Sequence, residues 1–329
     1  MVPLFTWFRD WGVSCASLGG GFCTLFVFRR DQPHVGWIVG YLLLLWFLFA
    51  LMTQVRGAVE ASGRRSGRLL VTAADYTIQS LCHGLLLFVL PAYWAATTFT
   101  SLNAPFFALL VALALVATFD PWYRALVHPR PWLGYVFFVV AVFSALNVAL
   151  PLVGLPPFPS LVASGFLAAA ALAPALHRAG GLTWREALRT AVAIGVVAAM
   201  AAAVGRALIA PVPLFVTDAT IGWIVGSVDS LEPALQAIPA TELKERGLVA
   251  YTPIYAPAGL SQRVRHVWRQ NGKVVEVVEL SPVRGGRREG FRTYSRKTAF
   301  PADPAGRWTV DVSTSSGQLV GRLSFRVTP

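Results

Sequence analysis

The sequence predicts an α-helical multi-span membrane bundle of about seven transmembrane helices, followed by a small all-β immunoglobulin-like antiparallel sandwich. Its 329 residues are 55% hydrophobic and only 13% charged, with a mean hydropathy of +0.58, whereas about a quarter of the residues in soluble domains are charged. Charge is also uneven, because residues 1–213 contain only 13 of the 28 Lys and Arg residues. These values exclude a disordered chain, a secreted disulfide scaffold and a single-core cytosolic enzyme.

Runs close to the roughly 20 apolar residues needed to cross a bilayer occur in seven places. They are residues 11–28, 35–53, 72–96, 104–119, 132–153, 160–177 and 190–210. The fourth run is short and the boundary before it is weak, so six or eight spans also fit. We expect the first run to be an uncleaved helix, because it lacks a basic leader and a cleavage site. The last two runs are rich in alanine and glycine, which predicts close helix packing.

Positive residues in short loops mark the cytoplasmic side of a membrane protein. One side of the predicted bundle carries most of them, namely Arg9, Arg56, Arg64, Arg65, Arg68, Arg124, Arg130, Arg178, Arg185 and Arg189. The other side carries only Arg29 and Arg30 in its short loops. We therefore expect a cytoplasmic N-terminus, and an odd number of spans then places residues 214–329 on the opposite side of the membrane.

The third predicted span contains a candidate intramembrane polar site. Asp75, Gln79 and His83 are spaced four residues apart, so they lie on one helix face, and Asn147 of the fifth span is a candidate partner. Ionisable groups are costly to bury in hydrocarbon, so the stripe predicts an ion site, a proton relay or a polar contact between helices. The alternative is that Asp75 is wetted at the surface while Gln79 and His83 only satisfy partners inside the bundle. A single histidine without further ligands at metal spacing predicts no metal and no cofactor.

Past residue 213 the sequence becomes a linker with a short helix (214–246) and then, over residues 247–329, alternates between apolar and polar residues. A period of two is typical of strands. The predicted strands cover residues 247–256, 263–269, 274–280, 291–298, 307–314 and 318–327. Asn271-Gly272 predicts a type I′ hairpin, because that turn needs positive φ at both central residues. Six strands with short turns favour an immunoglobulin-like sandwich, with a partly open barrel as the competing arrangement.

Alternation also predicts which side chains form the core of this domain. In the second strand Val264, His266 and Trp268 share one face, which we expect to be buried, while arginines occupy the other. Trp308 holds an inward position in the fifth strand. The two tryptophans are therefore predicted to fill the core.

The runs HVWRQNGKVVEVVEL, GFRTYSRKT and GRWTVDVSTSSGQLVGRLSFRV carry a family resemblance. Their order is His-x-Trp before a hairpin, Arg-Thr-Tyr-Ser-x-Lys, Gly-x-Trp-x-Val before a glycine turn, and a final Phe-x-Val. It resembles the bacterial domain of unknown function 2914 over about residues 247–329. The multi-span part resembles an uncharacterised membrane family found fused to that domain. The resemblance implies a bacterial envelope protein, hence an inner-membrane bundle with a periplasmic β-domain, and it implies no activity.

The chemistry of the predicted β-domain is mainly basic. The positive residues of one loop and the strand after it are Arg284, Arg287, Arg288, Arg292, Arg296 and Lys297. They predict a patch that binds phosphate, carboxylate or anionic lipid headgroups; the alternative is a solvated edge whose charges discourage aggregation. His266, Ser295 and Asp311 indicate a catalytic triad only weakly, because no nucleophile elbow accompanies them, and we expect no catalytic residue.

Two functions are compatible with these features. The leading hypothesis is a non-enzymatic envelope protein, in which the bundle anchors in the lipid bilayer and orients a β-domain that binds a partner protein, glycan or anionic lipid. The alternative is a transporter or membrane-embedded enzyme that uses the polar stripe of the third span. No nucleic-acid partner is expected, because the basic domain is predicted outside the cytoplasm.

Overall fold

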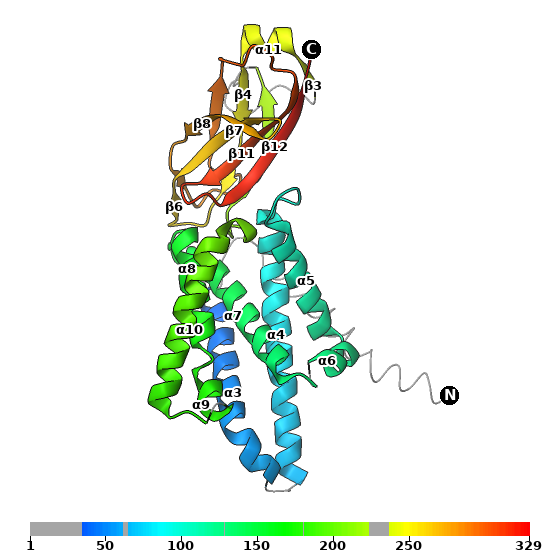
Figure 1. Ribbon diagram of the computed structural model, residues 1–329, viewed down its shortest axis with the longest axis vertical. Coiled ribbons are helices and arrows are strands. Elements are labelled where there is room, and N and C mark those ends of the chain that lie inside the picture. The colour runs from blue at the N-terminus through cyan, green and yellow to red at the C-terminus, as the bar shows by residue number, and fades with distance from the viewer. Residues whose placement is uncertain (1–34, 62–64, 128, 180, 224–236) are drawn as a thin grey trace, which may run out of the picture. The chain divides into compact units, whose positions relative to one another are not determined.

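The structure is a computed structural model that describes residues 35–61, 65–127, 129–179, 181–223 and 237–329 (Figure 1). The chain divides into two compact units. The helical unit comprises Met1–Pro91, Phe106–Ala149 and Pro159–Val204, and the β-rich unit comprises Ala92–Pro105, Leu150–Phe158 and Gly205–Pro329.

Helices occupy most of the apolar part of the chain. They are α3 (Val35–Ala61), α4 (Arg65–Ala96), α5 (Ala104–Thr118), α6 (Asp120–Leu126), α7 (Pro131–Leu152), α8 (Pro157–Ala170), α9 (Ala173–Ala179) and α10 (Trp184–Val204), and a short 3₁₀ turn, η2 (Gly205–Leu208), follows α10.

The predicted number of seven spans is not supported. Within the described ranges, four segments are long and apolar enough to cross a membrane: Asp75–Ala96, Pro131–Leu152, Pro157–Arg178 and Trp184–Ala207. A fifth is gained only if α5 and α6, which are bent by 104° at a short break, form one span. The predicted run 35–53 falls in α3, whose apolar stretch Leu42–Gln54 is too short, and the run 11–28 lies outside the described residues. The apolar helices still indicate membrane association.

Small residues bring α8 and α10 close together, as the sequence predicts. A Cβ added at Gly165 of α8 would lie 3.0 Å from the carbonyl oxygen of Ala198, and one added at Gly195 of α10 would lie 2.9 Å from the ring of Phe166. Larger residues at these two positions would push the helices apart. The rest of α10 exposes valine, isoleucine and methionine side chains, a surface suited to lipid.

The β-rich unit contains twelve named strands within its described part. They are β1 (Phe215–Val216), β2 (Thr220–Gly222), β3 (Ala237–Pro239), β4 (Leu248–Tyr251), β5 (Ile254–Tyr255), β6 (Ser261–Gln262), β7 (Val264–Gln270), β8 (Lys273–Glu279), β9 (Val283–Arg284), β10 (Tyr294–Lys297), β11 (Gly306–Thr314) and β12 (Leu319–Thr328), with helix α11 (Ala240–Arg246) between β3 and β4.

Two main sheets organise these strands (Figure 1). The larger has the order β3-β12-β11-β7-β8 and the smaller has the order β10-β4-β2, while β1 pairs with β5 and β6 with β9. All pairings are antiparallel except that of β12 with β3. The long strands β11 and β12 form a hairpin across the turn at Ser315–Gln318.

The β7–β8 hairpin forms as predicted. Asn271 has φ 48° and Gly272 has φ 83°, the positive values that a type I′ turn requires. In β7 the predicted inward side chains of Val264, His266 and Trp268 are all buried. The register set by this turn therefore places the apolar side of β7 in the core.

The core contains side chains from both main sheets. Trp268 of β7 and Trp308 of β11 are 0% exposed and pack with Leu248 of β4, Ile221 of β2 and Phe325 of β12. Both indole N–H groups find acceptors: that of Trp308 donates to the Pro304 carbonyl at 2.7 Å, and that of Trp268 donates to Ser295 Oγ at 3.1 Å. Both predicted core tryptophans are confirmed.

The β-fold begins earlier than the predicted start at residue 247. The stretch treated as a linker, 214–246, supplies β1, β2, β3 and α11. Ile238 of β3 and Leu243 of α11 are buried in the same core as the tryptophans. These strands have only two or three residues, too few to show a period of two in the sequence.

Candidate functional site

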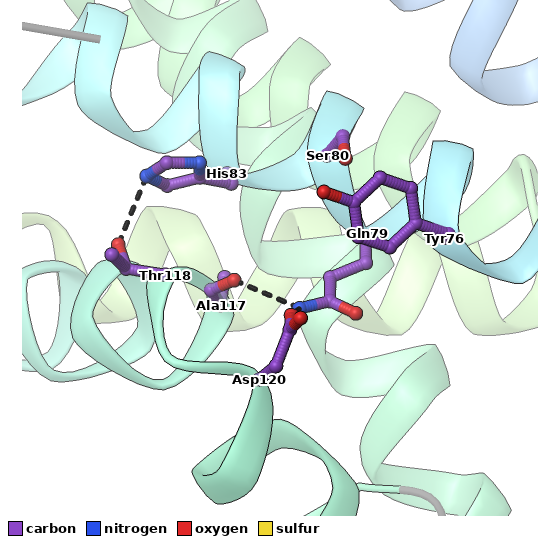
Figure 2. Close-up of a pocket in the computed structure, with 7 residues that line it drawn as sticks. All are labelled: Tyr76, Gln79, Ser80, His83, Ala117, Thr118 and Asp120. Carbon is purple, nitrogen blue, oxygen red and sulfur yellow. Dashed lines mark hydrogen bonds between the residues drawn. The ribbon is translucent and has the colours of Figure 1, made fainter. Parts of the chain in front are cut away.

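A polar cavity lies beside α4, where α5 ends and α6 begins (Figure 2). Its lining residues are Tyr76, Gln79, Ser80, His83, Ala117, Thr118 and Asp120. The space open to the centre of a water-sized molecule is about 10 Å³, which suits a single water. The cavity therefore has room for a water or a monatomic cation.

Side chains of α4 satisfy polar groups at the end of α5. The side-chain amide of Gln79 donates to the Ala117 carbonyl at 3.0 Å and to Asp120 Oδ1 at 2.9 Å. The last carbonyls of a helix lack partners within it, so this amide caps α5 from a neighbouring helix. Figure 2 shows the side chains of Gln79 and His83 pointing from α4 toward α5.

The hydrogen bonds also fix the position of a proton on His83. The hydroxyl of Thr118 donates to the Ala114 carbonyl at 2.7 Å. It must therefore accept from His83, whose Nε2 lies 2.9 Å away, so Nε2 carries a hydrogen. The cluster joins α4 to α5 through donors and acceptors that match.

The structure places only two of the four predicted intramembrane polar residues at this cavity. Gln79 and His83 line the cavity, whereas Asp75, half-buried on α4, and Asn147, 2% exposed on α7, are not among its lining residues. Sequence reasoning missed Asp120. The sequence Asp120-Pro121 after an apolar run is a signal for a new helix start, because proline and an acidic residue both favour the first turn.

Five of the six residues of the predicted basic patch are exposed, and Lys297 is buried. The exposed side chains are those of Arg284 on β9, of Arg287, Arg288 and Arg292 in the loop that follows, and of Arg296 on β10; these five are called the arginine segment below. Lys297 is only 4% exposed, forms an ion pair with Glu276 and lies 5.3 Å from the centre of the Phe300 ring. Neighbouring strand residues point to opposite faces, so Lys297 points inward when Arg296 points outward.

Within the described part of the chain, three of the five guanidinium groups in the arginine segment have no carboxylate partner. Among the described residues, Arg284, Arg287 and Arg296 form no ion pair. Arg287 lies 5.7 Å from the centre of the Phe291 ring, a cation–π contact that leaves its N–H groups available. Five exposed arginines on a stretch of thirteen residues can present many donors to an anion.

His266 and Ser295 do meet, but they do not form a catalytic triad. His266 Nδ1 lies 2.7 Å from Ser295 Oγ, while Asp311 binds Arg269 at 3.2 Å and Arg322 at 2.5 Å instead. His266 is 0% exposed and Ser295 is 3% exposed, so no substrate can reach them. Burial lowers the pKa of His266 to about 4, because the charged imidazolium is poorly solvated there.

Comparison with family models divides the chain near the start of β6. Residues 261–327 match a protein of unknown function, DUF2914, which confirms the predicted resemblance. Residues 5–250 match a family of unknown function, DUF5924, consistent with the predicted fusion. No curated protein and no solved structure matches the chain. The DUF5924 match covers most of the length of the chain, so the chain belongs to the family of unknown function DUF5924.

Proposed function

We propose that this protein is a bacterial inner-membrane envelope protein whose helical unit anchors a periplasmic, immunoglobulin-like β-domain. In this proposal the β-domain binds an anionic partner protein, glycan or lipid through the arginine segment. The distribution of arginines among the short loops supports a cytoplasmic N-terminus.

The arginine segment is the observation that carries the proposal. Its side chains are exposed, and three of the five have no ion pair within the described residues. The remaining polar features have internal roles: the cavity residues join helices, and the His266 network lies in the core. Anion binding uses side chains that are already exposed, whereas catalysis would need an accessible catalytic group.

The test uses the full chain in zwitterionic nanodiscs and sensors coated with polyglutamate, with anionic vesicles or with an uncharged polymer. The parent should bind both anionic sensors, and binding should weaken at high salt because screening shortens the range of charge attraction. Replacing Arg287, Arg288 and Arg292 by Glu should abolish it.

A matched control replaces Lys273, Arg307 and Arg326 by Glu. These side chains are also exposed, but they lie outside the arginine segment. Arg307 and Arg326 face each other across β11 and β12, so reversing both keeps a like-charge pair. The control should bind as the parent does; equal loss in both variants, or no salt-sensitive binding by the parent, contradicts the proposal.

A second candidate function is supported by the break between α5 and α6. Broken helices that border polar cavities bind ions in many transporters, and here the break adjoins His83 and Asp120. A cavity of this volume suits protons or a monatomic cation as the cargo. Vesicles containing the protein should then show cation or proton flux that Asp120→Asn and His83→Leu abolish; absence of flux in the parent removes this candidate.

A further inference from the structure

The end of the last candidate span lies in the same compact unit as the β-sheets. That span is Trp184–Ala207, and the β-rich unit begins at Gly205. Arg206 Nε donates to the Ser316 carbonyl at 2.7 Å, in the turn between β11 and β12. This turn therefore marks the end of the β-rich unit at which the chain leaves the membrane helix.

Further contacts connect this turn to several arginines. The Ser315 amide donates to the Arg263 carbonyl at 3.3 Å, and Ser261, two residues before Arg263, pairs with Arg284. Next along the chain, the Gly285 amide donates to the Leu260 carbonyl at 2.9 Å.

The loop after β9 is bound to the chain that follows the last span. Thr217 Oγ1 donates to the Glu289 carbonyl at 2.9 Å. Thr217 lies ten residues after Ala207, where the span ends, and ten residues of chain reach at most about 35 Å. The end-of-span arginines, defined as Arg206, Arg263, Arg284, Arg287 and Arg288, are all exposed.

Among the described residues of this end, exposed positive side chains outnumber exposed negative ones. The exposed carboxylates there are those of Asp218, Glu279 and Glu289, against the five end-of-span arginines. In addition, Arg265 Nε and Ser313 Oγ, on paired positions of β7 and β11, are buried with no hydrogen-bond partner among the described residues. Because both atoms are buried, they do not reach a ligand at the surface, and the positive surface of this end comes from the exposed arginines.

We propose that the end-of-span arginines bind the phosphate groups of anionic phospholipids in the membrane leaflet at which the last span ends. The proposal rests on the proposed anion-binding function and specifies the anion. Guanidinium groups suit phosphate because they donate two parallel hydrogen bonds. The hydrogen bonds from Arg206 to Ser316 and from Ser315 to Arg263 connect these arginines to the end of the span, so the lipid is the anion present at the highest local concentration.

The inference is tested on the full chain in uncharged detergent micelles. Native mass spectrometry would measure the apparent Kd for phosphatidylglycerol and for phosphatidylcholine. One variant replaces Arg263, Arg284 and Arg287 by Gln, and the matched control replaces Lys273, Arg307 and Arg326 by Gln. Arg307 and Arg326 lie at the end of the β11–β12 hairpin opposite its turn. All six side chains are exposed, and melting curves would verify that each variant folds.

The parent should prefer phosphatidylglycerol, and the end-of-span variant should lose that preference by roughly fivefold per arginine, which is the fold-change for about 1 kcal/mol per basic residue near an anionic surface. The control should keep it. Equal binding of phosphatidylglycerol by the parent and the end-of-span variant overturns the inference, because the lipid then binds elsewhere on the chain.

A parent that binds both lipids equally also overturns the inference. If that parent still binds polyglutamate in a salt-sensitive manner, the proposed function stands and only the identity of the anion is wrong. If it binds no anionic probe, both proposals fail.

Discussion

His266 belongs to a chain of hydrogen bonds in which the direction of each bond can be derived. The hydroxyl of Thr293 donates to the Thr252 carbonyl at 2.5 Å, so the Thr252 hydroxyl donates to Thr293 Oγ1 at 2.9 Å. Thr252 Oγ1 must then accept from His266 Nε2 at 2.8 Å. Ser295 accepts from the Trp268 indole and donates to His266 Nδ1.

This arrangement requires a neutral imidazole, which gives a prediction for the pH dependence of stability. Burial lowers the folded-state pKa of His266 to about 4, below the ordinary value near 6.5. Between these values the unfolded chain binds a proton that the folded chain does not. Stability from this group is therefore complete above pH ~6.5 and is lost as pH falls toward ~4, by roughly 3 kcal/mol.

Urea unfolding of a fragment of residues 205–329 at several pH values measures this effect. Because carboxylates also titrate in this range, the comparison is with His266→Gln, which has no imidazole. The free energy of unfolding of the parent should exceed that of the variant near pH ~7, and this difference should shrink as the pH falls. A difference that is constant between pH ~7 and ~4 would show that His266 is not kept neutral by the fold.

At the scale of elements, sequence periodicity predicts faces but not partners. The β7–β8 hairpin and the inward side of β7 follow from Asn271-Gly272 and from alternation, both local signals. Alternation along β10 places Lys297 on the face opposite Arg296, but its partner Glu276 lies on another strand, which no local pattern reveals. Strand β3 escaped prediction because it is three residues long and pairs with β12, about ninety positions later.

Periodicity also predicts only part of the polar site on α4, because it gives the face of a residue and not its partner. Helical spacing shows that Gln79 and His83 share a face of α4, but the groups they meet, Thr118 and Asp120, come from the end of α5 and the start of α6. Asp75 has the same spacing and does not line the cavity. Residues of this polar stripe reach the break between α5 and α6 only if they also lie at the right height along α4, which periodicity does not give.

The cap on α5 gives a prediction about Gln79. Gln79→Leu keeps a similar volume but leaves the Ala117 carbonyl and Asp120 without their amide donor, so it should destabilise the folded protein by about 1–3 kcal/mol. Ser80→Ala is the control, because Ser80 lines the same cavity but is exposed. Thermal unfolding of the full chain in micelles compares them, and an equal melting temperature for both variants would refute the role of Gln79 as a cap.

At the scale of the whole molecule, the boundary between the two family matches cuts through one folding unit. Strand β2 and residues 248–250 of β4 lie in the stretch 5–250, whereas β10, which pairs with β4, lies in the stretch 261–327. Leu248 and Ala250 of β4 share a core with Trp268 and Trp308. The DUF2914 stretch is therefore completed by strands from the DUF5924 stretch.

Truncation tests this shared core. A fragment of residues 205–329 should unfold cooperatively in urea, whereas residues 261–329 should not, because they lack β2, β4 and the apolar side chains those strands bury. Because the net stability of a small domain is only about 5–15 kcal/mol, loss of these core side chains is expected to unfold it. Cooperative unfolding of residues 261–329, measured by circular dichroism, would show that the smaller match is a domain by itself.

The proposed function requires the β-rich unit to lie across the membrane from the arginine-containing loops. Single cysteines, introduced after replacement of Cys15, Cys23 and Cys82 by Ser, can be labelled in intact cells with a membrane-impermeant maleimide. Cysteines at Ser101 and Ser315 should react without permeabilisation, whereas cysteines at Gly63 and Gly180 should react only after it, as the positive charge of their loops predicts. Labelling of Gly63 and Gly180 alone in intact cells would contradict the account.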